Sequence, residues 1–515
     1  MPIAKVYSAA VVGLGSVPVE VEVDLSSGLH AFSIVGLPDT AINESKERVS
    51  SAIKNTGPIP PQHSKRRVIV NLAPADLKKQ GPAYDLPIAV AFLLASGQIK
   101  FNNIEDKIFV GELSLEGKLR SVNGILPIVL MARDKNFKTI FVPDSNAKEA
   151  ALVNDIDVIP VKSLEQLLKH FEETQIINTC PATDISQYYL QSNYPVDMAH
   201  VSGQQQAKRA LEIAAAGNHN ILLSGPPGSG KSLLAKALPS ILPPLTKEEV
   251  LETTKIFSVA GQLSKDHPLI TIRPFRTPHH TASAASLVGG GAYPKPGEIS
   301  LAHRGVLFLD ELPEFSRYVL ESLRQPLEDG IITIARAQNS LTFPAKFTLV
   351  AAQNPCPCGK AGDPNQQCTC SPVQVFKYSR KISGPLLDRI DLHVEVPALE
   401  YKEISSEITP EASASIRARV QKARQIQWQR FCEDNADGKQ TLTNGEMDIE
   451  QIKKYCRIES QTQDLLKTAV CQLHLSTRSY HRLLKVSRTI ADLEASPNIQ
   501  LAHMAEALQY RFKKE

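Results

Sequence analysis

The pattern of apolar and polar positions in the first third of the chain predicts strands mixed with helices. Residues 19–25 alternate with a period of two, which is typical of a half-buried strand. Shorter runs predict four further strands, at residues 32–36, 67–72, 108–112 and 139–143. Helical patterns cover residues 39–55 and 85–95, and the second of them is the more apolar. Because strands and helices follow one another without strict alternation, we expect an α+β domain over residues 1–175.

The rest of the chain carries a different pattern. Polar residues with Pro181 and Pro195 predict a linker over residues 176–198. Beyond it, residues 199–400 combine helices with short, continuously apolar runs, which is typical of an α/β core with a buried sheet. Three of these runs predict central strands, at residues 221–223, 305–309 and 348–352. From residue 401 to residue 515 the pattern is helical, so we expect a helical domain there.

Composition and charge narrow the class of protein. A chain of 515 residues exceeds what one hydrophobic core organises, so roughly two to four domains are expected. The net charge of +3 permits a nucleic-acid partner without arguing for one. The longest apolar run, residues 86–95, is too short to span a bilayer, and the N-terminus does not resemble an export signal. Eight cysteines in such a chain do not predict a disulfide framework. We therefore expect a soluble cytoplasmic protein with no membrane partner.

A glycine-rich segment lies between an apolar run that predicts a strand and a run that predicts a helix, residues 233–238. Its residues are Gly225, Pro226, Pro227, Gly228, Ser229, Gly230, Lys231 and Ser232. This spacing in this context is typical of a phosphate-binding loop, whose backbone N–H groups bind phosphate oxygens of ATP. Lys231 is expected to contact the β- and γ-phosphates, and the Ser232 hydroxyl to bind Mg²⁺. The helix just before this segment is predicted to begin with Ser202 as its N-cap.

Polar residues follow two of the predicted core strands. Asp310 and Glu311 end one strand, and Asn354 lies just after another. Asp310 is expected to bind the Mg²⁺ shell and Glu311 to polarise the attacking water. An amide such as Asn354 is suited to orient that water and to sense the γ-phosphate. These residues together predict ATP hydrolysis.

Two arginines are further candidates for contacts with the nucleotide. Arg389 lies among apolar anchors, as do arginines that reach the γ-phosphate of a neighbouring subunit. Arg478 begins a helix near the C-terminus, and we expect the helical domain to carry it over the nucleotide. A surface ion pair is the alternative interpretation of Arg389.

Four cysteines fall close together within residues 356–370, and they are Cys356, Cys358, Cys368 and Cys370. Soft thiolate ligands in a cytoplasmic protein favour tetrahedral Zn²⁺, and a short loop needs such a ligand to be ordered. The C-x-C spacing departs from the commoner C-x-x-C, so free thiols and a disulfide or iron–sulfur centre stay open. We expect a structural zinc site. The adjacent His279 and His280 do not predict a metal site, because neighbouring side chains point apart on most backbones.

The N-terminal domain resembles the proteolytic domain of Lon-type proteases. The resemblance rests on residues 110–117, 122–126 and 139–143. In that family a serine after Gly-Pro and a lysine after a V-x-G segment form the catalytic dyad. Here Ala83 follows Gly81-Pro82, and residues 125–129 contain no lysine. We therefore expect a protease fold without a nucleophile, kept as a scaffold.

The second half resembles the AAA+ ATPases of the magnesium-chelatase and MCM branch, and the whole layout is similar to the ComM/YifB family. Insertions resembling those of the branch occur at residues 276–297 and 331–343. The resemblance implies a homo-hexamer whose insertions line a central pore. It also implies a DNA helicase that drives branch migration when transforming DNA is integrated, acting on single-stranded, forked or branched DNA beside a recombinase or other recombination proteins. Candidate cations for the DNA backbone in that pore are Lys295, Arg336 and Lys346.

Other functions remain open at this point. A chelatase-type motor that remodels a protein partner for metal insertion shares the same ATPase motifs. An ATP-dependent protease is disfavoured by the missing dyad. A nucleotide-gated scaffold without turnover is disfavoured by Lys231, Glu311 and Arg389 together.

Overall fold

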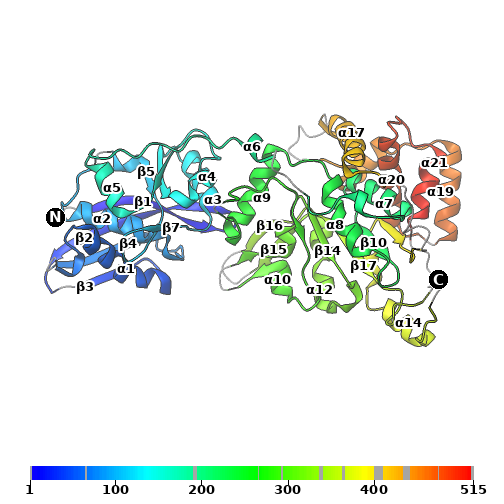
Figure 1. The fold of residues 1–515 in the computed structure, drawn as a ribbon, viewed down its shortest axis with the longest axis horizontal. Coiled ribbons are helices and arrows are strands. Elements are labelled where there is room, and N and C mark those ends of the chain that lie inside the picture. Colours follow the sequence, from blue (N-terminus) through cyan, green and yellow to red (C-terminus); the bar gives the residue numbers. More distant parts are fainter. Residues whose placement is uncertain are drawn as a thin grey trace. The chain divides into compact units, whose positions relative to one another are not determined.

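The structure is a computed structural model that describes residues 3–29, 31–63, 66–101, 103–189, 194–264, 266–291, 294–335, 340–361, 366–399, 410–432, 441–473 and 475–511. The chain forms two compact units (Figure 1). The first combines Met1–Gln191 with Lys247–Thr271, and the second combines Ser192–Thr246 with Ile272–Glu515. This division differs from the domain boundaries expected above, because residues 247–271 leave the second unit and join the first. None of the helices in the described residues combines the length and apolar character needed to cross a membrane.

The first unit is built on a seven-stranded mixed sheet of order β3-β4-β2-β1-β5-β8-β9. Its strands are β1 (Ala4–Val12), β2 (Gly15–Ser27), β3 (Ala31–Val35), β4 (Arg66–Ala73), β5 (Lys107–Phe109), β8 (Thr139–Pro143) and β9 (Asp157–Val161). Its main helices are α1 (Thr40–Thr56), α2 (Asp85–Ala95), α3 (Ile125–Asp134), α5 (Leu164–Phe171) and α9 (Lys247–Ala260). Strands β1, β2 and β4 pair antiparallel, and the outer pairs are parallel. The expected α+β character is therefore present.

The alternating pattern of β2 explains how it lies in this sheet. Val19, Val21 and Val23 are fully buried, whereas the residues between them are half-buried. Helix α1 begins at Thr40 because the Asp39 carboxylate accepts a hydrogen bond from the Ile42 N–H at 2.8 Å. Helix α2 is buried along nearly all of its length, so its sequence carries no polar face.

The second unit contains a five-stranded parallel sheet of order β11-β14-β17-β10-β18 (Figure 1). Its strands are β11 (Phe275–Arg276), β14 (Val306–Leu309), β17 (Thr348–Gln353), β10 (Ile221–Ser224) and β18 (Leu392–Glu395). Side chains on both faces are buried: Leu223 packs in one hydrophobic core and Leu222 in the other. Burial on both faces is why these strands are continuously apolar in the sequence.

Helices enclose the parallel sheet and form the C-terminal part of the second unit. Those of the core are α7 (Gln205–Gly217), α8 (Lys231–Ile241), α10 (Ala284–Val288), α11 (Glu298–Leu301), α12 (Arg317–Ser322), α13 (Arg324–Asp329), α14 (Pro372–Ser379) and α15 (Gly384–Leu387). The C-terminal ones are α17 (Ser413–Cys432), α18 (Ile449–Tyr455), α19 (Ser460–Gln472), α20 (Thr477–Leu493) and α21 (Leu501–Gln509) (Figure 1). The expected helical C-terminal region is therefore present, and it shares a hydrophobic core with α7 and α8.

Two short hairpins interrupt the core. Strands β12 (Gly289–Gly290) and β13 (Lys295–Pro296) form the first, and β15 (Ile331–Ala335) and β16 (Ser340–Pro344) form the second. They fall where the two insertions were expected.

One helix boundary was predicted wrongly. Helix α7 begins at Gln205, and its N-cap is Gln204 rather than Ser202. Gln204 takes a left-handed conformation with φ of 54°, so the chain turns there and no helix runs through Ser202. The Gln204 side chain instead donates hydrogen bonds to Ser229 O at 3.3 Å and Pro397 O at 2.7 Å. Gln204 thus supports the glycine-rich segment, a role that the sequence did not indicate.

Candidate functional site

The glycine-rich segment connects the end of β10 to the start of α8. Gly228 and Gly230 have φ values of 80° and 93°, which favour glycine, and a Cβ at either position would meet no atom within 4 Å. The Ser229 hydroxyl is buried, and no described residue forms a hydrogen bond with it. Open space beside glycines and the N-terminus of an 11-residue helix suit an anion. The segment therefore fits the phosphates of a nucleotide.

Lys231 is the first residue of α8, and its ammonium group lies inside this segment. It donates to Gly225 O at 2.7 Å and Pro226 O at 2.8 Å, and it lies 3.3 Å from Asn354 Oδ1. Burial lowers the pKa of Lys231, and the charge of Asp310 opposes that shift. The two predicted residues Lys231 and Asn354, which are 123 positions apart, are thus brought together because β10 and β17 are parallel neighbours.

Asp310 follows β14, the strand on the other side of β17. Its carboxylate accepts a hydrogen bond from Ser232 Oγ at 2.8 Å. A hydroxyl beside a carboxylate at the end of a phosphate-binding loop is a donor set that Mg²⁺ accepts. Ser232 and Asp310 are therefore suited to hold Mg²⁺ as predicted.

Glu311 has a different side-chain contact from Asp310. Its φ is 51°, and its carboxylate lies 3.5 Å from His280 Nδ1. The rings of His279 and His280 lie 4.1 Å apart, so the expectation that these side chains point apart is wrong. Sequence reasoning considered His280 only as a metal ligand and missed its contact with Glu311. The contact could have been predicted from the position of His280 shortly after β11, because β11 is the neighbour of β14 in the sheet and Glu311 follows β14.

Arg389 lies at the opposite end of the sheet. Its backbone carbonyl accepts a hydrogen bond from Asn220 Nδ2 at 3.3 Å, and Asn220 directly precedes β10. The glycine-rich segment follows the other end of β10, about 13 Å away for a four-residue strand. Arg389 is thus separated from the phosphate loop of its own chain.

Arg478 lies beside Arg389. Both guanidinium groups bind the carboxylate of Glu328, Arg478 Nη2 at a distance of 2.6 Å. Arg478 is thus remote from the phosphate loop of its own chain, so a contact with a nucleotide would involve one bound by another copy.

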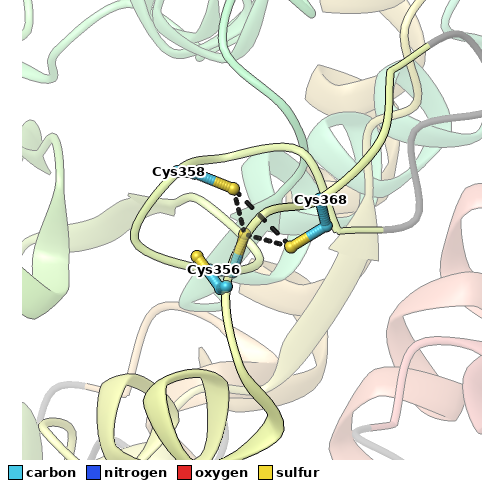
Figure 2. A group of neighbouring side chains, drawn as sticks. Cys356, Cys358 and Cys368 are labelled. Atoms are coloured by element: carbon cyan, nitrogen blue, oxygen red, sulfur yellow. Dashed lines mark hydrogen bonds between the residues drawn. The ribbon is translucent and has the colours of Figure 1, made fainter.

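The four clustered cysteines form a compact group of sulfur atoms (Figure 2). Cys356 Sγ lies 3.4 Å from Cys358 Sγ and 3.7 Å from Cys368 Sγ, and the latter two are 3.6 Å apart. A tetrahedral zinc ion with Zn–S bonds of about 2.3 Å places its sulfur ligands about 3.8 Å apart. All four ligand atoms, including that of Cys370, lie within 4.8 Å of one another. The group therefore fits Zn²⁺.

Cysteines of this group differ in the pKa values of their thiols. Backbone N–H groups of Lys360 and Thr369 lower the pKa of the Cys358 thiol to about 5, which favours the thiolate that a metal binds. The pKa values of Cys368 and Cys370 are raised in the presence of the neighbouring Cys356 and Cys358 thiols. All eight cysteines lie in the described residues and are free thiols.

The cysteine group packs against the phosphate loop. Cys356 comes two residues after Asn354, and Gly359 lies against Pro227. A Cβ on Gly359 would lie 2.6 Å from Pro227 Cδ, so only glycine fits there. The cysteine loop thus contacts the glycine-rich segment on one side and continues from the Asn354 strand on the other.

The three cations predicted to contact DNA differ in what the structure describes of them. Lys295 is exposed in β13. The Lys346 ammonium group lies 3.8 Å from a carboxylate oxygen of Glu446, so it is paired rather than directed to a partner. Arg336 lies outside the described residues.

The N-terminal unit holds no Lon-type dyad at the expected positions in the described residues. Ala83 lies in a short 3₁₀ helix, and Ile125 begins α3 with a buried apolar side chain. The neighbouring Asp85 is buried and binds Arg48 Nε at 2.7 Å, which is a structural ion pair. The Lon protease of Rhizobium meliloti is 25% identical to this chain over 135 residues, which cover 25% of this chain and 16% of that protease.

The sheet order, with a phosphate loop after β10, carboxylates after β14 and an amide after β17, defines a nucleotide-binding protein of the AAA+ class. The family model described as magnesium chelatase, subunit ChlI matches residues 197–404. Two further models of the same subunit match residues 21–146 and, for its C-terminal part, residues 410–511.

Relatives match along the whole chain. The competence protein ComM of Haemophilus influenzae is 43% identical over 99% of this chain and 98% of its own length. The protein YifB of Escherichia coli is 42% identical over 99% of this chain and 97% of its own length. The chain belongs to the ComM/YifB family.

Proposed function

We propose that this protein is a cytoplasmic, ring-forming ATPase that moves DNA and promotes branch migration when transforming DNA is integrated. The observation that carries the proposal is the position of the phosphate loop and of Arg389 and Arg478 at opposite ends of one sheet. One copy therefore supplies the phosphate site and a neighbouring copy the arginines. The link to DNA uptake is supported by similarity to a protein named for competence.

Each residue of the site has a separate role in the proposed hydrolysis of ATP. Lys231 binds the β- and γ-phosphates, and Ser232 and Asp310 hold Mg²⁺, which neutralises charge that develops between these phosphates. Glu311 polarises the attacking water, and Asn354, in contact with Lys231, orients it. The arginines of the neighbour stabilise the transition-state charge.

The ring is proposed to be a homo-hexamer. A phosphate loop at one end of the sheet and arginines at the other make a head-to-tail interface, which closes into a ring when the rotation permits. The two insertions then face a central pore, where Lys295 and Arg336 contact the phosphates of single-stranded, forked or branched DNA. Lys346 is not proposed for this role, since it pairs with Glu446.

Zinc is proposed for the cysteine group, with a structural role. Cys356, Cys358, Cys368 and Cys370 would hold it and so fix the loop between Asn354 and the phosphate loop. The N-terminal unit is proposed as a Lon-like scaffold without peptidase activity, and recombinases or other recombination proteins as partners.

A chelatase-type motor acting on a protein partner is the second candidate, and the magnesium chelatase family model favours it. The two functions are separated by the effect of DNA on ATP turnover. Forked or three-way DNA junctions are expected to raise the turnover of the purified protein and to be unwound in an ATP-dependent way. Lys231→Ala is the matched control and is expected to do neither. A rate of ATP hydrolysis that no DNA structure changes would contradict the DNA function and would favour the chelatase-type motor.

A further inference from the structure

Glu328 joins three elements of the second unit. It lies in the last turn of α13, and its carboxylate binds Arg389, which follows α15, and Arg478, at the start of α20. The Arg389 side chain is 8% exposed, whereas those of Glu328 and Arg478 are 45% and 43% exposed. One half-exposed carboxylate thus holds both arginines that the proposed function assigns to the nucleotide of a neighbour.

Glu328 also lies close in the chain to the base of the β15–β16 hairpin. Helix α13 ends at Asp329, and its C-cap Gly330, with φ of 65°, turns the chain directly into β15. The Gly330 carbonyl accepts a hydrogen bond from the Ala345 N–H at 2.8 Å, just after β16. Glu328 thus lies two residues before the turn that is hydrogen-bonded to the end of the hairpin.

The guanidinium group of Arg389 does not use all of its hydrogen-bond donors when Glu328 is its partner. Its Nη1 donates to Pro385 O at 2.7 Å, and its Nη2 binds Glu328. Its Nε is buried, and within the described part of the chain it has no hydrogen-bond partner. A buried donor without an acceptor costs free energy, so the guanidinium retains an unused donor for an anion. The hydrogen bond from Arg389 lowers the pKa of Glu328, which keeps the carboxylate charged at neutral pH.

Phosphate and carboxylate compete for the same guanidinium geometry. Both accept paired N–H donors, but the γ-phosphate carries more charge and more acceptor oxygens than one carboxylate. The ion pair between Glu328 and Arg478, in which both side chains are half-exposed, is weak enough to exchange. Two arginines held on one carboxylate are therefore ready for transfer to a phosphate.

We propose that Glu328 is a positioning residue that holds Arg389 and Arg478 until the γ-phosphate bound by a neighbouring copy takes them. Its release frees the base of the β15–β16 hairpin and so couples nucleotide binding to the hairpin. This inference rests on the proposed function, because it requires that the arginines serve a second copy.

The test compares Glu328→Gln with Asp329→Asn, which removes the same charge from the next residue of the same helix. Without its charge, Glu328 no longer competes for the arginines. ATP turnover without DNA is then expected to rise roughly three- to tenfold, the worth of one or two exposed ion pairs. Stimulation by forked DNA is expected to disappear, while Asp329→Asn behaves as the unmodified protein. Glu328→Asp, whose shorter side chain cannot bridge both arginines, is expected to change turnover in the same direction.

Unchanged turnover in Glu328→Gln, or a fall both with and without DNA, would overturn this role and leave Glu328 as a structural tie. Arg389→Ala distinguishes a failure of the role proposed for Glu328 from a failure of the shared ATP site. If it abolishes hydrolysis while Glu328→Gln changes nothing, only the role of Glu328 fails. If it hydrolyses ATP normally, the shared site itself fails.

Discussion

Two adjacent carboxylates, Asp310 and Glu311, have different surroundings although they share one strand end. Asp310 accepts a hydrogen bond from Ser232, whereas Glu311 adopts a left-handed backbone conformation and is directed to His280. A non-glycine residue in that conformation costs about 1 kcal/mol or more and persists where the surroundings require it. The arrangement separates the carboxylate that is proposed to hold Mg²⁺ from the one that is proposed to polarise the attacking water.

Glu311→Gln tests this separation. The variant is expected to bind ATP normally, because Lys231, Ser232 and Asp310 are unchanged. Its turnover is expected to fall about 10²- to 10⁴-fold, the usual loss for a missing general base. Retention of a fluorescent ATP analogue and phosphate release measure the two effects. Glu314→Gln, an exposed carboxylate paired with Lys381, is the control, and normal turnover in Glu311→Gln would exclude the assigned role.

The residues that sequence reasoning found are those whose role is encoded locally. Lys231 and Ser232 follow glycines at fixed spacing, and Asp310 ends an apolar run. His280 and Glu328 were missed because each contacts a residue that is about 30 to 150 positions away in the sequence. Such residues come together only when the chain folds, so the local sequence does not show the contact. The contact between Arg478 and Glu328 was not predicted, for the same reason.

At the scale of elements, the buried central strands were predicted closely, whereas strands β1, β9 and β18 were missed and the packing of helices was not predicted. Val306–Leu309 and Thr348–Gln353 lie within a residue of their predicted bounds, because burial on both faces leaves a continuous apolar run. Helix α9 belongs to the first unit, where Ser258 donates to the buried Glu149 at 2.5 Å. Periodicity shows that a helix has an apolar face, but not which core receives it.

The cysteine loop is the element that the proposed zinc ion would hold in place. The purified protein is expected to carry about one equivalent of zinc, and removing it with a chelator is expected to lower the unfolding temperature and weaken ATP binding. The second effect follows because Gly359 packs on Pro227 of the phosphate loop. Cys356→Ser is expected to reproduce both effects, and Cys471→Ser, an exposed thiol outside the group, neither. Zinc content below about a tenth of an equivalent would contradict the assignment.

At the scale of the whole molecule, the second unit carries the phosphate loop and Arg389 at opposite ends of its parallel sheet. The phosphate loop follows the carboxyl end of β10, and Arg389 is bound near its amino end. The net charge of +3 is too small to attract DNA by itself, so attraction depends on cations gathered in an assembly. Assembly is therefore required for both parts of the proposed function.

Mixing two inactive variants tests the shared site most directly. Lys231→Ala lacks a working phosphate loop and keeps its arginines, whereas Arg389→Ala keeps the loop and lacks its main arginine. Each variant alone is expected to hydrolyse almost no ATP. In an equal mixture, random head-to-tail assembly restores about one quarter of the sites, so turnover is expected to recover toward that fraction. A mixture that stays as inactive as its two components would contradict a site built from neighbouring copies.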